Sequence, residues 1–176
     1  MKAWQHFCTI TRHKLMVMEG CFKVGLYWQG LMHDMSKYSY TEFRVGAKYY
    51  QGTRSPNNAE REDIGVSTAW LHHKGRNKHH FEYWMDYVPG GSGIFEMKMP
   101  IKYIVEMFMD RRAASKNYLG EQYTDRSPLE YFQKSRADKF MHEETSRQLE
   151  EMLQMLADKG EKETFSYIKK QVLRKR

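Results

Sequence analysis

The chain has few cysteines and no long hydrophobic run. Its two cysteines, Cys8 and Cys21, form no C-x-x-C pair and are too few for a disulfide scaffold. A reducing cytosol is therefore the expected compartment. No apolar stretch reaches the roughly 18 residues that a membrane helix needs, and no apolar region follows residues 1–6 as it would in a signal peptide. We accordingly expect a cytoplasmic protein with no membrane partner.

The charge of the chain is basic. It has 29 Lys and Arg residues against 22 Asp and Glu residues, a formal net charge of +7. This excess favours acidic partners such as phosphate esters, nucleotides or nucleic acid. A basic surface without a ligand would have the same composition, so charge alone does not select the partner. At 176 residues with 40% hydrophobic content, the chain can form one folded domain with a sizeable core.

Strand patterns are scarce, whereas helical patterns recur along the chain. No alternating run of Val, Ile and Thr is bounded by turn residues. From Phe7 to Leu26, apolar residues return every three to five positions, which predicts one helix or two helices divided at a glycine. We expect an all-α protein, a bundle of about six to eight helices.

Capping residues predict where several helices begin. Ser39 and Glu42 have the spacing of a capping box, and Ser127 to Glu130 repeats it with Pro128 at the first helical position. Residues 51–59 are a predicted polar loop. Further predicted helices span residues 39–50, 60–74, 79–87, 100–118 and 141–159, the last ending at Gly160 as a C′ glycine before a basic C-terminal helix.

Histidine is abundant for a chain of this length. Four of the eight histidines fall in one window as two pairs, His72-His73 and His79-His80, on either side of a predicted helix break at Gly75. Imidazole is the commonest protein ligand of zinc, iron and similar metals. The window is therefore a candidate metal site, with a basic surface strip as the alternative.

A second candidate site is the dipeptide His33-Asp34. A neutral imidazole beside a carboxylate suits a divalent metal ion. Apolar residues precede the pair, which favours its burial, and Lys37 follows Asp34 by three residues on the same helical side. The tryptophans and tyrosines near the histidine window, Trp70 among them, are predicted core residues, with a stacking platform for a base as the alternative.

Together, His13, the segment 30–37 (GLMHDMSK) and Asp110 resemble the H…HD…D pattern of the HD-domain superfamily. Within it, the chain is most similar to an uncharacterised family of small helical proteins, through that segment and block 70–80 (WLHHKGRNKHH). Some members of that family carry a catalase label, but nothing in this sequence resembles a haem site. The resemblance implies an HD-type helical metal-binding domain over residues 1–160 and a basic C-terminal helix or tail over 161–176.

The resemblance also implies a metal ion and its ligands. The ion would be divalent Mn, Zn, Mg, Fe, Co or Ni, held by His13, His33, Asp34 and Asp110. One branch of the superfamily binds extra metals through further histidines and has a lysine where this chain has Lys37. The candidate ligands of a second metal are His72, His73, His79 and His80. That branch's Gly-Tyr-Pro tripeptide is absent, so a cyclic dinucleotide substrate is not supported.

The superfamily commonly hydrolyses phosphate esters of nucleotides, which makes a metal-dependent phosphohydrolase the leading hypothesis. A bound metal lowers the pKa of its water and polarises a phosphoryl oxygen. The candidate catalytic residues are Asp34, Lys37 and Glu106, the last of which would orient a ligand or move a proton. The candidate phosphate-binding residues are Lys37, Arg76, Arg111 and Arg112.

Two other functions stay open at this point. Some HD proteins hold two irons and activate oxygen, so a di-iron oxygenase is the first alternative. The second is a non-catalytic protein that binds nucleic acid or a nucleotide through its basic tail. His6 and His142 receive no role, and the oligomeric state is not specified by the sequence.

Overall fold

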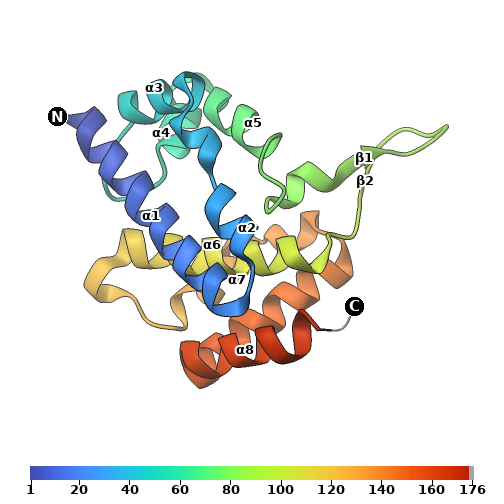
Figure 1. The fold of residues 1–176 in the computed structure, drawn as a ribbon. Coiled ribbons are helices and arrows are strands. Elements are labelled where there is room, and N and C mark those ends of the chain that lie inside the picture. Colours follow the sequence, from blue (N-terminus) through green and yellow to red (C-terminus); the bar gives the residue numbers. More distant parts are fainter. Residues whose placement is uncertain (175–176) are drawn as a thin grey trace.

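A computed structural model describes residues 1–174 and is mostly helical, as predicted (Figure 1). The α-helices of this part are α1 (Lys2–Val24), α2 (Tyr27–Met32), α3 (Tyr40–Lys48), α4 (Pro56–Ile64), α5 (Thr68–Lys74), α6 (Ile101–Leu119), α7 (Ser127–Ser135) and α8 (Glu143–Tyr167). Shorter helical turns are η1 (Met35–Tyr38), η2 (Phe81–Trp84), η3 (Gly120–Gln122), η4 (Ala137–Phe140) and the π-helical η5 (Ile168–Val172). None of these helices is both long and apolar enough to cross a membrane.

The three long helices α1, α6 and α8 pack around one hydrophobic core, with α7 beside α6 and α8. Helix α6 is buried around most of its circumference, since every residue from 104 to 109 is buried. Such a helix lies inside the molecule instead of on its surface. One face of α6 contributes Phe108 to the core, while Glu106 on another face is a buried carboxylate that needs polar partners.

Helices α3, α4 and α5 form a second group beside the N-terminal half of α1 (Figure 1). Helix α3 approaches α1 closely at Gly46, where a Cβ atom would overlap the imidazole of His6. The glycine is therefore required by the packing of the two helices. Helix α1 joins the two groups, and α2 and η1 run between them.

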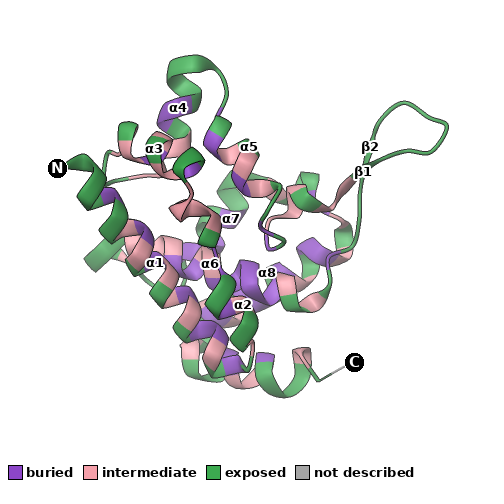
Figure 2. Cartoon of the chain, turned by 45° about the horizontal axis from the view of Figure 1, so that its top comes forward, coloured by how far each residue is buried: buried purple, intermediate pink, exposed green. Residues whose placement is uncertain are grey.

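A β-hairpin projects from the helical body (Figure 2). Strands β1 (Met85–Tyr87) and β2 (Ile94–Glu96) pair antiparallel, with Asp86 opposite Phe95. The predicted helix over residues 79–87 is therefore wrong: η2 is one 3-10 turn, and the chain then turns back through the Pro- and Gly-rich residues 89–93. Helical spacing over a few residues does not exclude a hairpin when a turn sequence follows.

Several predicted helix ends differ in the structure. The predicted helix over 60–74 is two helices, because Gly65 adopts a left-handed φ of 77° and ends α4. Helix α4 starts at Pro56, inside the predicted loop 51–59, since proline suits the first helical turn. The N-cap of α7 is Arg126 and not Ser127, whose hydroxyl accepts the Thr124 N–H at 3.0 Å.

Helix α8 does not end at Gly160. That glycine has non-helical φ 77° and ψ 175°, which produces a kink, and the helix then continues to Tyr167. Phe165 and Ile168 beyond the kink belong to the core. The segment 161–176, predicted as a basic C-terminal helix or tail, is helical as far as Val172 and packs on the core; Lys175 and Arg176 lie outside the described residues.

Candidate metal centre

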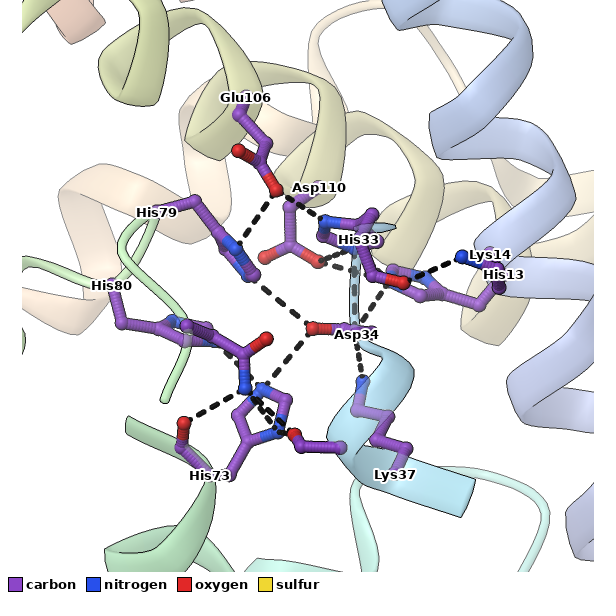
Figure 3. Close-up of polar contacts among 12 residues, drawn as sticks. His13, Lys14, His33, Asp34, Lys37, His73, His79, His80, Glu106 and Asp110 are labelled. Atoms are coloured by element: carbon purple, nitrogen blue, oxygen red, sulfur yellow. Dashed lines mark hydrogen bonds and ion pairs between the residues drawn. The ribbon is translucent and has the colours of Figure 1, made fainter. Parts of the chain in front are cut away.

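Four stretches of chain meet between the two helix groups (Figure 3). Helix α1 contributes His13, the turn between α2 and η1 contributes His33 and Asp34, and α6 contributes Glu106 and Asp110. The fourth stretch, α5 and the loop after it, contributes His73, His79 and His80. The centre is therefore assembled by the tertiary fold.

The His33-Asp34 dipeptide lies in a turn, not within a helix. His33 is the C-cap of α2, and Asp34 has a left-handed φ of 54°, which is uncommon for a residue other than glycine. Lys14 on α1 donates from Nζ to the carbonyls of Leu31 at 2.6 Å and His33 at 2.8 Å. These bonds fix the turn against α1 and hold the Asp34 backbone in this conformation.

The first pocket consists of His13, His33, Asp34 and Asp110. Nε2 of His13 lies 2.9 Å from Oδ1 of Asp110 and 3.6 Å from Oδ2 of Asp34. Nε2 of His33 lies 3.3 Å from the same Asp34 oxygen and 3.6 Å from Asp110. One donor atom from each residue lies within 4.8 Å of the others. The structure thus brings together the four residues of the predicted H…HD…D set; their ligand role stays a prediction.

The second pocket consists of Asp34, His73, His79 and His80. Oδ1 of Asp34 lies 3.3 Å from Nε2 of His73 and 3.5 Å from Nε2 of His79. His80 closes the group, with its Nε2 at 2.9 Å from Nε2 of His73. Asp34 is common to both pockets and faces the first with Oδ2 and the second with Oδ1.

The residues of both pockets fit a bound metal ion. Asp34 is only 2% exposed, and Nζ of Lys37 lies 2.6 Å from its Oδ2, but its Oδ1 accepts no hydrogen bond within the described part of the chain, and Nε2 of His79 also lacks a partner. Buried polar atoms without partners are costly, and a cation would supply the missing interaction. Two imidazoles with two carboxylates, and three imidazoles with one carboxylate, suit Zn, Fe, Mn, Co or Ni.

Two further carboxylates contact the Nδ1 atoms of the imidazole rings, on the side of each ring away from Nε2. Oε1 of Glu106 accepts from Nδ1 of His33 at 2.9 Å and from Nδ1 of His79 at 3.2 Å. Glu42 on α3 accepts from Nδ1 of His72 at 2.6 Å and of His73 at 2.8 Å. In each bond, the carboxylate fixes which nitrogen carries the proton and leaves Nε2 free to bind a metal. Glu106 thus lies beside two imidazoles of the centre, and the orienting role predicted for it stays a prediction.

Glu42 is part of the buried centre, although its sequence pattern did not predict this position. Its capping-box spacing predicted that its side chain would return to the N–H of Ser39. Only half of the box forms: the Ser39 hydroxyl accepts the Glu42 N–H at 3.4 Å, but the Ser39 N–H is donated to the carbonyl of Ser36. The Glu42 carboxylate is consequently free to bind the histidines of α5.

The electrostatics of the centre keep the carboxylates ionised. Burial would raise the pKa of Asp34, but His33 and Lys37 hold it well below its ordinary range. Burial also opposes ionisation of Asp110, whose pKa is likewise lowered well below that range by His13 and His33. Carboxylate ligands bind metals in this ionised form.

The histidines divide into two kinds. Burial, together with the neighbouring His79 and His73, lowers the pKa of His80, and burial with Lys37 nearby lowers that of His13. These two rings are neutral and ready to bind a metal. Burial acts against protonation of His33 as well, but Asp34 raises its pKa well above the ordinary value, so a metal ion would replace this proton.

The predicted phosphate-binding residues lie in different places. Lys37 is at the centre, with Nζ 2.6 Å from Oδ2 of Asp34. Arg111 follows Asp110 on α6, and its guanidinium lies over the ring of Phe132. Arg112 points to another side of α6 and pairs with Glu161 at 2.6 Å.

Two predicted site residues are not brought to either pocket. Arg76 is exposed and donates to the carbonyl of His72 at 3.2 Å. His72 contacts Glu42 and belongs to neither pocket. These two residues and Arg112 thus lie outside both pockets, which corrects the predicted site: Arg76 lies in the exposed turn after α5, His72 is held by Glu42, and Arg112 is held by Glu161.

The aromatic residues near the histidines also differ in role. Trp70 lies edge-on to the ring of His80, with centroids 4.7 Å apart, and so forms one wall of the second pocket. Trp84 packs against the core, as predicted, whereas Tyr83 is exposed.

Comparisons with known proteins give a family but no activity. Neither the search among curated proteins nor the search among solved structures found a match to the chain. A family model matches residues 2–155, which include every residue of both pockets. The match does not assign the chain to the HD superfamily, so that resemblance stays a prediction. By this match over most of its length, the chain belongs to a family of unknown function, DUF5662.

Proposed function

We propose that the chain is a metal-dependent phosphohydrolase that acts on a nucleotide or a related phosphate ester with two divalent cations. The observation that carries this proposal is the buried Asp34 carboxylate, which faces the first pocket with one oxygen and the second pocket with the other. A carboxylate shared by two cation sites is a natural ligand for a two-metal centre, and such centres serve many phosphatases and nucleases.

Each pocket would hold one cation through its four residues. Bound divalent cations lower the pKa of coordinated water and polarise phosphoryl oxygens, the two effects that phosphoester hydrolysis requires. Glu106 holds one imidazole of each pocket in position, so it is a positioning residue in this proposal. The buried surroundings strengthen these electrostatic effects because they exclude water.

The basic side chains of the protein favour an anionic substrate. The Lys37 side chain is 30% exposed and that of Asp110 is 18% exposed, so these two residues mark the side of the centre that meets solvent. Burial lowers the pKa of Lys37, but the nearby Asp34 carboxylate raises it above its ordinary value. The ammonium therefore stays charged. Its position suits it to bind a phosphate oxygen and to stabilise charge that develops there. The net charge of +7 also favours approach of an anion.

The second pocket favours one alternative function. Its three imidazoles and one carboxylate suit iron as well as zinc. A di-iron oxygenase is therefore the second candidate, and the metal content and the reaction catalysed distinguish it from a hydrolase.

The test begins with protein purified without chelator. We expect about two divalent cations per chain by elemental analysis, as a two-metal hydrolase requires. The loaded protein should hydrolyse at least one member of a panel of mononucleotides, dinucleotides and phosphodiesters. Asp34→Ala should abolish metal retention and hydrolysis together, whereas Asp158→Ala, at an exposed aspartate paired with Arg126, should leave both unchanged.

Three results would overturn the proposal. A metal-free protein that also fails to bind added cations would remove the metal centre. A two-iron protein that hydrolyses nothing but consumes oxygen with an organic substrate would establish the oxygenase. A protein that does neither, yet binds nucleic acid in a salt-dependent way, would be a binding protein.

A further inference from the structure

We propose that Glu42 is the positioning residue of the second pocket alone, so that it controls occupancy of that pocket without affecting the first. The inference rests on the two-metal function proposed above, and it assigns a role to a residue outside both ligand sets. It starts from the contacts of one buried carboxylate on α3 with two consecutive residues of α5.

The geometry around Glu42 selects the orientation of His73. Glu42 is 5% exposed, and its Oε2 lies 2.8 Å from Nδ1 of His73. An ionised carboxylate only accepts, so Nδ1 must be the protonated nitrogen. The opposite nitrogen, Nε2, then carries the lone pair, and it lies inside the second pocket, 3.3 Å from Oδ1 of Asp34 and 2.9 Å from Nε2 of His80. His73 is in this way presented to the second pocket in the form that binds a metal.

The other oxygen of Glu42 fixes the helix that carries His73. Oε1 lies 2.6 Å from Nδ1 of His72, the preceding residue of α5. Two bonds to adjacent residues hold this turn of α5 in one rotation about its axis. From η1, the Ser36 hydroxyl lies 3.2 Å from Nδ1 of His73 and accepts a hydrogen bond from the Asn77 amide. The ring of His73 is therefore held from several directions.

The two supporting carboxylates act on different sets of ligands. Glu106 binds His33 of the first pocket and His79 of the second. Glu42 makes no hydrogen bond or ion pair with His13, His33 or Asp110 in the part of the chain that the structure describes. Removing the Glu106 carboxylate should thus weaken both pockets, whereas removing the Glu42 carboxylate should weaken only the second.

The test uses Co²⁺ added to the metal-free full chain, followed by visible absorption and elemental analysis. Glu42→Gln replaces one of the two carboxylate oxygens with an NH₂ group, which only donates, so the two imidazoles no longer each face an acceptor. We expect it to bind one Co²⁺ with the wild-type affinity and the second about 10- to 100-fold more weakly, the usual effect of losing such a partner. Glu106→Gln should weaken both. Asp158→Ala, at the exposed aspartate that pairs with Arg126 far from both ligand sets, is the control and should retain both ions.

A second measurement reports on His73 in the wild-type chain and needs no metal. Nitrogen-15 NMR at a pH where His73 is neutral should show the Nδ1–H tautomer. In Glu42→Gln, the His73 signals should shift or show a mixture of tautomers, while those of His13 and His33 should not change. This result would stand even if the protein bound no metal, so failure of the proposed function and failure of this inference are separate outcomes.

The inference is overturned by any of three results. The first is a Glu42→Gln protein that binds both Co²⁺ ions as the wild type does. The second is equal weakening of both ions while the helical circular dichroism is retained. The third is an Nε2–H tautomer for His73 in the wild-type chain, a result that also decides the question if Glu42→Gln does not fold.

Discussion

Lys37 and Asp34 show how the chemistry of the centre depends on single residues. The ammonium of Lys37 touches the shared carboxylate but belongs to neither group of candidate ligands. It is also the more exposed member of the pair. Its position therefore suits binding of the substrate and not of the metal.

Lys37→Ala should keep both metal ions but lower kcat/KM for phosphoester hydrolysis by about 10²–10³, since it removes one electrostatic contact to the reacting phosphate. Metal content and steady-state kinetics of the same preparation measure the two effects. Lys98→Ala is the matched control, because Lys98 is an exposed lysine that pairs with Glu144. Loss of metal in Lys37→Ala would show that the lysine is structural instead.

His6 is a second residue whose environment has a measurable consequence. Burial, with Lys37 as a further cause, lowers its pKa to about 4, and its side chain packs beside Phe43 and Tyr50. Between pH 6.5 and pH 4, the unfolded chain therefore binds a proton at this position that the folded chain does not. The stability contributed by neutral His6 is complete above pH 6.5 and is lost as the pH falls toward 4.

His6→Asn should reduce the acid sensitivity of folding. The free energy of unfolding of the wild type should fall relative to that of the variant by roughly 3 kcal/mol at most between pH 7 and pH 4. Urea unfolding at several pH values measures this difference. The contributions of the other histidines to the pH dependence cancel, because both proteins contain them. Parallel pH profiles would contradict the assignment to His6.

At the scale of elements, α1 and α3 approach each other closely at Gly46. Gly46 lies within α3, in its last turn, where alanine would ordinarily favour the helix. The imidazole of His6 occupies the space that a Cβ would need. Packing therefore overrides helix propensity at this position.

Gly46→Ala should destabilise the fold by about 1–3 kcal/mol, the usual cost of overpacking. His6→Ala should remove much of that penalty in the double variant, because it makes room for the added methyl group. Gly75→Ala is the control, since its Cβ would meet nothing closer than 3.6 Å. Chemical unfolding of the wild type, the two single variants and the double variant gives the coupling energy between positions 6 and 46. Strictly additive changes in the free energy of unfolding would contradict the clash.

At the scale of the whole molecule, the candidate centre connects the helices of the main core to the group of α3, α4 and α5. The first pocket ties α1 to α6 and to the turn after α2, and the second ties that turn to α5 and its following loop. Helices α3, α4 and α5 share no residue with the main hydrophobic core cluster. Bound metal ions would thus cross-link the two helix groups.

Metal removal should consequently lower the melting temperature. A cation at 100 times its dissociation constant stabilises the folded state by about 2.7 kcal/mol. For a chain of this size, that corresponds to a shift of about 5–11 °C. Differential scanning fluorimetry with Zn²⁺ or Mn²⁺ against chelator measures it. Asp34→Ala should show no such shift, whereas the Asp158→Ala control should shift as the wild type does; an equal response of both variants would place the stabilising metal elsewhere.

The sequence by itself determined the helical class, the burial-prone His33-Asp34 pair and the histidine-rich window, because helix periodicity and ligand chemistry are properties of neighbouring residues. It also indicated Glu106, one helical turn from Asp110. The tertiary structure alone decided the rest. It turned Arg112 toward Glu161 and placed His72 outside both pockets. It also directed Glu42 to α5 instead of its own helix start. His13 meets Asp110 across 97 positions of the chain, and local patterns carry no information on contacts at that range.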